Sequence, residues 1–204
     1  MKTNRRKTGI ALLAAMLLIA LACLAACGSG SSGGGGEDSV LNDYPEADMS
    51  GYAGLRGSKA EAKYADLTVK DLKVLMDNGE SFALFVSYAD CPWCNTLIPY
   101  LSQATEENGG VIGYLDTRKD PSWQSNMDIT NYDVFVKLFD KFLRTDDEGK
   151  KHLYVPVVYF IKDGKVVSAH EGVVDGLEGP DDILSEDQEK ELLAILDDGF
   201  KSIR

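Results

Sequence analysis

The chain has 204 residues, of which 44% are hydrophobic and 26% charged, and its formal net charge is −12. This composition is typical of a folded globular protein rather than of a disordered chain. The acidic balance argues against binding nucleic acid or anionic lipid through charge, because both need a basic surface.

The N-terminal segment has the pattern of an export signal. Four basic residues near the start are followed by an uncharged apolar run at 10–22; they are Lys2, Arg5, Arg6 and Lys7. A basic flank, a short apolar core and small residues at its end predict a signal peptide over residues 1–26. An uncleaved membrane anchor is the alternative, since the apolar run is near the lower length limit for a bilayer span.

Residues 24–27, Leu-Ala-Ala-Cys, resemble the lipobox of bacterial lipoproteins, in which the cysteine is lipidated and becomes the first residue. Cys23 is a poorer match to that pattern. The resemblance implies an exported protein, lipid-anchored through Cys27 to the outer face of the bacterial cell membrane. Cleavage would remove four of the 21 basic residues and no acidic one, which leaves 17 basic against 33 acidic residues.

Residues 27–60 are expected to be the lipidated cysteine and a linker. Residues 29–36 are only Gly and Ser, a composition that predicts a flexible tether. Residues 37–59 are polar and show no clear period, so we interpret them as extended or loosely packed; a first strand or helix hidden there is the alternative.

Residues 61–204 are expected to form one domain of alternating strands and helices. A short strand at 64–67 is followed by a helix, which Thr68 caps together with Asp71 three residues on. Apolar runs and helical spacing then predict a strand, a helix and a strand, at 82–88, 95–107 and 111–116.

The second half of the domain continues this alternation. Aromatic and aliphatic residues at three- and four-residue spacing predict a helix over most of 121–144. After a charged turn at 146–151, two strands at 155–161 and 166–169 are joined by a tight turn. Ser185 caps a closing amphipathic helix. This order predicts a mixed sheet with helices on both faces.

Cys91-Pro92-Trp93-Cys94 lies between the strand at 82–88 and the helix at 95–107. Two cysteines separated by two residues can close a disulfide within one turn and reopen it. Cys91 would lie at a helix N-terminus, where unpaired amides and the helix dipole favour a thiolate. The arrangement is that of a redox-active dithiol.

Three features of residues 64–204 resemble the thioredoxin superfamily. A Cys-x-x-Cys follows a strand, with Pro99 five residues after Cys94. Val155-Pro156 heads an apolar strand, as the cis-proline of thioredoxins does, and Gly172 follows where the family has a glycine beside its active site. The resemblance implies an α/β thioredoxin-like fold, a central mixed sheet flanked by helices, with residues 117–152 as a helical insertion before the cis-proline strand.

The resemblance also implies an activity, thiol–disulfide exchange with protein thiols or disulfides. Cys91 would be the exposed nucleophile and Cys94 the resolving thiol, while Pro156 would face the disulfide. Substrate contacts are expected from Trp93, Val155 and Gly172; simple packing is the alternative for the tryptophan. No cofactor and no metal are expected. Besides protein substrates, the expected partners are a membrane redox protein and the membrane itself, which the lipid on Cys27 would bind.

Two positions depart from the family pattern. Phe85 stands where thioredoxins have a buried aspartate that is thought to assist proton transfer from the resolving thiol, and Asp90 stands where they have a tryptophan. A carboxylate beside Cys91 is expected to raise the pKa of that thiol. A reductant, an oxidant and an isomerase all fit the motif, and we favour a reductase slightly.

Three other interpretations of the dithiol are open. Cys-x-x-Cys is half of a common zinc-ligand set, but there is no second cysteine pair, and His152 and His170 are 18 residues apart and expected at the surface. A purely structural disulfide would close a loop too small to constrain the unfolded chain much. Finally, residues 85–101 resemble bacteriocin transport accessory proteins, which would make the chain a binding module with a dispensable dithiol.

Overall fold

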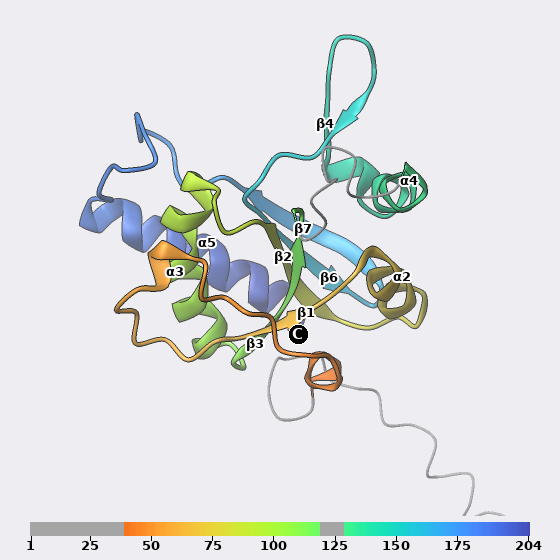
Figure 1. Cartoon of the computed structure of the whole chain (residues 1–204), viewed down its shortest axis with the longest axis horizontal. Coiled ribbons are helices and arrows are strands. Elements are labelled where there is room, and N and C mark those ends of the chain that lie inside the picture. The colour runs from red at the N-terminus through yellow and green to blue at the C-terminus, as the bar shows by residue number, and fades with distance from the viewer. Residues whose placement is uncertain (1–38, 119–128) are drawn as a thin grey trace, which may run out of the picture. The chain divides into compact units, whose positions relative to one another are not determined.

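The computed structural model describes residues 39–118 and 129–204, which contain a five-stranded mixed sheet in the order β1-β3-β2-β6-β7 (Figure 1). β2 pairs in parallel with β3, which pairs in parallel with β1; β6 and β7 are antiparallel. The strands are β1 (Lys63–Asp66), β2 (Phe82–Ser87), β3 (Val111–Asp116), β6 (Val157–Lys162) and β7 (Lys165–Glu171).

Two helices cover each face of this sheet (Figure 1). On one face lie α3 (Pro92–Glu107) and α5 (Glu186–Ser202), and on the other α2 (Val69–Asp77) and α4 (Ile129–Phe139). The central strand β2 is therefore buried along its whole length, as expected for a strand covered on both faces. The strand order and the two helical layers confirm the thioredoxin-like α/β fold predicted from the sequence.

The helix starts show why the sequence pattern was informative. The hydroxyl oxygen of Thr68 accepts a hydrogen bond from the Asp71 N–H at 3.2 Å, and the Asp71 carboxylate accepts one from the Thr68 N–H at 2.9 Å. Ser185 and Gln188 form the same reciprocal pair at the start of α5. Each cap satisfies amides that the first helical turn leaves without a partner, and both predicted caps are confirmed.

The insertion before β6 is only partly helical. The predicted helix is confirmed for α4 and continues into the 3-10 turn η4 (Asp140–Phe142); residues 119–128 lie outside the described residues. The chain then forms a two-stranded hairpin, β4 (Arg144–Thr145) and β5 (Lys151–His152). The predicted charged turn at 146–151 forms the tip over residues 146–150, and Lys151 already belongs to β5. There the Asp146 carboxylate accepts hydrogen bonds from the N–H groups of Glu148 and Lys150 at 3.0 and 2.8 Å.

The prediction for the segment before β1 is wrong. Residues 39–59 pack on the domain instead of forming a loose linker, with 3-10 turns at η1 (Val40–Asp43) and η2 (Ala53–Leu55). Leu41 is 1% and Tyr52 2% exposed. Because these side chains enter the core singly, the segment shows no helical or strand period. The predicted signal peptide, Cys27 and the Gly/Ser tether lie outside the described residues, within which no helix is long and apolar enough to cross a bilayer.

Candidate functional site

Cys91 and Cys94 form a disulfide at the N-terminal end of α3, with their Cα atoms 5.1 Å apart. Cys91 is the N-cap residue, and Pro92, which has no N–H to leave unpaired, takes the first helical position. The N–H of Cys94 points at Sγ of Cys91 at 3.2 Å. This amide and the helix dipole would stabilise a thiolate on Cys91 once the disulfide is reduced.

The loop that leads into β6 faces this sulfur. The peptide bond between Val155 and Pro156 is cis, and the Val155 carbonyl oxygen lies 4.0 Å from Sγ of Cys91. The N–H of Gly172 donates to the Pro156 carbonyl oxygen at 2.9 Å, which ties the end of β7 to the same loop. The structure thus brings Cys91, Cys94, Val155, Pro156 and Gly172 together at one end of the sheet.

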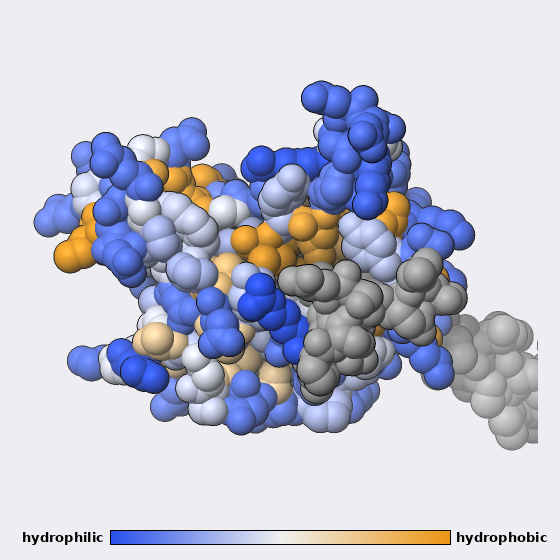
Figure 2. Space-filling view, turned by 45° about the horizontal axis from the view of Figure 1, so that its top comes forward, coloured by the Kyte–Doolittle hydropathy of each residue, from blue (hydrophilic) through white to orange (hydrophobic). Residues whose placement is uncertain are grey.

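The disulfide lies just below the surface. Cys91 is 3% and Cys94 0% exposed. The expectation that Cys91 is exposed is therefore wrong for the protein with its disulfide formed. The partly exposed side chains of Tyr88, Trp93 and Val155 pack against the same buried cluster. The more accessible sulfur therefore lies among partly exposed apolar side chains. In Figure 2, where the β4–β5 hairpin is the blue projection at the upper right, apolar side chains gather on the surface beside that hairpin.

Phe85 is 0% exposed and belongs to the same buried cluster as Cys91 and Cys94; it stands where thioredoxins, which the sequence resembles, have an aspartate. The rings of Tyr52, Tyr64 and Tyr114 lie around it, with centroids 6.1 to 6.4 Å from its own. Among the described residues no carboxylate side chain is buried. A proton that leaves or reaches Cys94 therefore needs an acceptor or donor other than a buried acid.

Three buried hydroxyl groups are hydrogen-bonded to one another in the core. The Tyr52 hydroxyl bonds to the Ser87 hydroxyl and, at 3.0 Å, to that of Tyr114. Burial raises the pKa of Tyr52 to about 12, and the two hydrogen bonds lower it only in part. These groups are consequently neutral donors and acceptors at neutral pH. Tyr52 was missed by sequence reasoning because a lone tyrosine in a polar stretch carries no pattern.

Asn95 was also missed. Its side-chain N–H₂ donates to the carbonyl oxygens of Ala89 at 2.7 Å and of Cys91 at 2.9 Å, while its Oδ1 accepts from the Gly54 N–H at 2.9 Å. One amide thus joins the dithiol turn to the segment that precedes β1. Its only sequence signal is a polar residue directly after the second cysteine, which is too common to interpret.

His170 is not the surface histidine that the sequence suggested. It lies on β7 opposite Val158, on the sheet face that α3 and α5 cover, and its buried Nε2 has no hydrogen-bond partner. Burial lowers its pKa, against an opposing hydrogen bond with the backbone of Val173. His152 instead lies 2.6 Å from Asp146 on the hairpin. In the described part of the chain no three His, Cys, Asp or Glu side chains are grouped to hold a metal.

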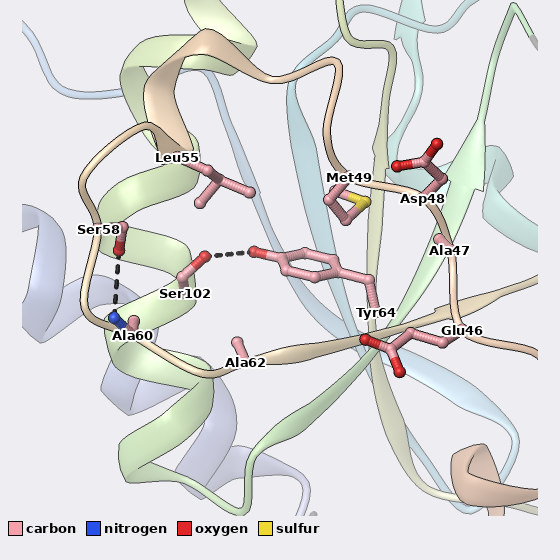
Figure 3. A pocket seen from close by; sticks show the side chains of 10 residues that line it. All are labelled: Glu46, Ala47, Asp48, Met49, Leu55, Ser58, Ala60, Ala62, Tyr64 and Ser102. Carbon is pink, nitrogen blue, oxygen red and sulfur yellow. Dashed lines mark hydrogen bonds between the residues drawn. The ribbon is translucent and has the colours of Figure 1, made fainter.

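A cavity of about 330 Å³ lies away from the dithiol, between the segment at 46–62 and α3 (Figure 3). The Tyr64 hydroxyl crosses it to bond with Ser102 at 2.7 Å. Glu46 and Asp48 line its rim, and none of the predicted site residues does. The cavity therefore gives no support to a role in thiol chemistry.

No protein-family model and no curated protein matches the chain. Among solved structures it is similar to thioredoxin from Aeropyrum pernix, with 15% identity and a TM-score of 0.39, over 68% of this chain and 85% of that one. It is also similar to thioredoxin O2 from Arabidopsis thaliana in the oxidized state, with 13% identity and a TM-score of 0.35, over 57% of this chain and 86% of that one.

Both likenesses are low, and the resemblance to bacteriocin transport accessory proteins stays a prediction. The fold is defined by the molecule itself: three parallel strands, two antiparallel strands, a dithiol turn after β2 and a cis-proline before β6. The chain has a thioredoxin-like fold, and Cys91 of its Cys91–Cys94 pair is the N-cap residue of α3, the helix that follows the central strand.

Proposed function

We propose that the protein is an extracytoplasmic, membrane-tethered thiol–disulfide oxidoreductase that acts on protein thiols or disulfides through Cys91 and Cys94. The observation that carries the proposal is the 4.0 Å between Sγ of Cys91 and the carbonyl oxygen of Val155. A substrate chain aligned along the backbone of Val155 would bring its own sulfur to Cys91. The apolar surface around Trp93 supports docking of a polypeptide.

The exchange runs in two balanced steps. A substrate thiolate attacks Sγ of Cys91, the Cys91–Cys94 bond breaks, and Cys94 leaves as a thiolate that takes up a proton. A second substrate thiolate then attacks the substrate sulfur of the mixed disulfide and releases Cys91. The substrate loses two electrons and the dithiol gains them; reduction of a substrate disulfide is the same sequence reversed.

The order of the two cysteines follows from their surroundings. Cys91 is the less buried of the two and has the Cys94 N–H and the helix N-terminus directed at its sulfur, whereas Cys94 is fully buried. The sulfur that is both reachable and best stabilised as a thiolate is the one that forms the mixed disulfide. Pro156 has no N–H and cannot ligate a metal, so it leaves the sulfur free to react.

The activity is tested by equilibrating the protein with a series of glutathione ratios and titrating its thiols. We expect one reducible disulfide with a potential between about −270 and −120 mV, the range of related dithiols, and its value fixes the favoured direction. Cys91→Ser should abolish catalysed exchange. If the dithiol never exchanges, or if Cys91→Ser leaves the biological role intact, the chain is an accessory binding module instead.

The tether is tested separately. The sequence of residues 24–27 supports lipidation of Cys27 after export. In a bacterial host, Cys27→Ser should abolish incorporation of labelled fatty acid and remove the protein from the washed membrane fraction. Cys23→Ser is the matched control and should leave both unchanged. Equal lipid labelling in the two variants would contradict the proposal.

A further inference from the structure

Two stretches of the chain contain neither lysine nor arginine, residues 74–117 and 166–189. The first carries the dithiol and the whole of α3. The second carries all of β7 after its first residue, the loop that follows it and the start of α5. It contains eight acidic residues: Glu171, Asp175, Glu178, Asp181, Asp182, Glu186, Asp187 and Glu189.

These two stretches meet at the dithiol. The Thr96 hydroxyl oxygen lies 3.2 Å from the carbonyl oxygen of Pro92, the residue after Cys91, and donates to the carbonyl oxygen of Pro180 at 2.7 Å. One helical turn further, the Tyr100 hydroxyl donates to the Glu189 carboxylate at 2.9 Å. The loop at 174–184, hereafter the acidic loop, is thus one side chain away from the Cys-Pro-Trp-Cys turn.

Hydrogen bonds fix the conformation of the acidic loop. The Asp182 carboxylate accepts from the N–H groups of Glu178 and Gly179 at 2.7 and 2.9 Å, and Gln188 Nε2 donates to the Asp175 carbonyl oxygen at 3.1 Å. The exposed carboxylates of Asp175, Glu178 and Asp181 form no ion pair in the described part of the chain. Their negative charges are therefore available to a partner.

Basic side chains offset only part of this charge. Lys190 pairs with Glu186 and Asp187 at 3.9 and 3.7 Å, and Arg144 is paired with Glu171. Arg118 lies over the ring of Tyr88, 3.6 Å from its centroid. Asp90, directly before Cys91, is exposed and adds a further negative charge. The acidic loop and Asp90 consequently border the apolar surface beside the disulfide, and most of their carboxylates form no ion pair with another described residue.

We propose that the polypeptide segment that docks beside Cys91 is cationic, with lysine or arginine flanking the reacting cysteine. The inference rests on the exchange function proposed above. Apolar atoms of the segment would cover the surface beside the disulfide while its basic side chains reach the acidic loop. Such charge complementarity raises the rate of encounter and selects partners more than it raises affinity, and salt screens it.

The test compares two peptides with one cysteine each, flanked by lysines in one and by glutamates in the other. Each cysteine is blocked with a 2-thiopyridyl group. The Cys91 thiolate of the reduced protein attacks the peptide sulfur and releases pyridine-2-thione, and Cys94 then displaces the peptide thiol and reforms the disulfide. Each rate constant is divided by that of dithiothreitol, a neutral thiol, with the same peptide, which removes intrinsic reactivity.

We expect the lysine peptide to react about tenfold faster at low salt, and the ratio to fall towards one at about 0.5 M salt. The triple variant Asp175→Asn/Glu178→Gln/Asp181→Asn should lower the low-salt ratio at least about threefold. It leaves Asp182 in place because that carboxylate holds the loop. The matched control, Glu106→Gln/Glu107→Gln/Asp198→Asn, removes the same charge from the far ends of α3 and α5 and should keep the wild-type ratio.

The outcomes separate the two proposals. Equal normalised rates for both peptides, or equal losses in the loop variant and the remote control, would overturn the cationic-substrate inference and leave exchange standing. Failure of both peptides to react, with two titratable thiols in the reduced protein, would overturn the exchange function and the inference with it.

Discussion

The N–H of Gly54 donates to Oδ1 of Asn95 at 2.9 Å, so the segment before β1 is fastened to the first turn of α3. The same side chain bonds to the carbonyl oxygens of Ala89 and Cys91. A part of the chain that contributes no reacting atom therefore helps to hold the dithiol turn in place. This relationship can be tested from both of its ends.

Asn95→Ala should remove three hydrogen bonds, so that the Gly54 N–H and the Ala89 carbonyl oxygen lose this partner, while the Cys91 carbonyl oxygen keeps its bond from the backbone N–H of residue 95. We expect a loss of about 1–3 kcal/mol in the free energy of unfolding, measured by urea denaturation, and a slower reaction of Cys91 with disulfides. Asn108→Ala, which removes hydrogen bonds at the opposite end of α3, is the matched control. It should cost similar stability and leave the exchange rate unchanged; equal loss of rate in both variants would exclude a positioning role for Asn95.

Gly54→Ala tests the other end of the contact. A Cβ at this position would run into the carbonyl group of Asn95, inside van der Waals contact. Because the obstacle is helix backbone, the segment must shift, at a cost of about 1–3 kcal/mol in unfolding free energy. At Gly179 a Cβ meets nothing within 4 Å, so Gly179→Ala should be close to neutral. Two neutral variants would show that the segment is not held at this point.

Single-cysteine variants should separate the roles of the two sulfurs. With Cys94→Ser, a mixed disulfide formed at Cys91 cannot be resolved internally, so covalent complexes with substrate proteins should accumulate on non-reducing gels. Cys91→Ser should give few or none, because Cys94 is fully buried. Complexes in similar amount from both variants would contradict the assigned order of attack.

The depth of the disulfide predicts a dependence on reagent size. Cys91 is 3% exposed, so in the reduced protein a small alkylating agent such as iodoacetamide should modify it. A maleimide that carries a bulky polymer should react much more slowly, while both react alike with the protein unfolded in urea. Trp93→Ala should reduce the difference in rate between the small and the bulky reagent if the indole borders the path to Cys91. Equal rates for small and large reagents in the folded protein would indicate a wider approach.

His170 predicts loss of stability in acid. Burial lowers the pKa of its imidazole in the folded state, so the unfolded chain binds a proton more readily. Its contribution is fully present above the unfolded value of about 6.5 and is lost as the pH falls below it, by about 1.4 kcal/mol for each unit of pKa depression. His170→Leu should flatten the decline in unfolding free energy between about pH 7 and pH 5, whereas His152→Gln should retain it. A steep decline in His170→Leu would assign the acid sensitivity to other groups.

The fold could be predicted because most of its helices and strands have signals in their own local sequence. Thr68 and Ser185 cap their helices through residues three positions on, and the apolar run at 82–88 needs no distant partner to be recognised as a buried strand. Cys91 and Cys94 were evident for the same reason. The role of Asn95 was not, because its partners Ala89, Cys91 and Gly54 are brought together only by the folded chain.

His170 and Tyr52 escaped prediction for a related reason. β7 alternates exposed and partly buried residues only over 165–168, and its last three residues are all partly buried. Its sequence therefore does not show that the His170 imidazole is covered. The burial of Tyr52 depends on hydroxyl partners on β2 and β3, Ser87 and Tyr114, which are 35 and 62 residues away. Single side chains that enter a core from an irregular segment leave no periodic trace in the sequence.

The backbone around Glu46 also decides how far the polypeptide can be shortened. β1 is the outermost strand on its side of the sheet, and residues 45–47 close that side: the Ala47 N–H donates to the Tyr64 carbonyl oxygen and the Asp66 N–H to that of Pro45, both at 2.8 Å. A version trimmed to begin at Ala60 would bare these groups, and an open strand edge pairs readily with its counterpart on another molecule. A protein that begins at Ala60 should therefore self-associate, whereas a protein that begins at Ser39 should remain monodisperse.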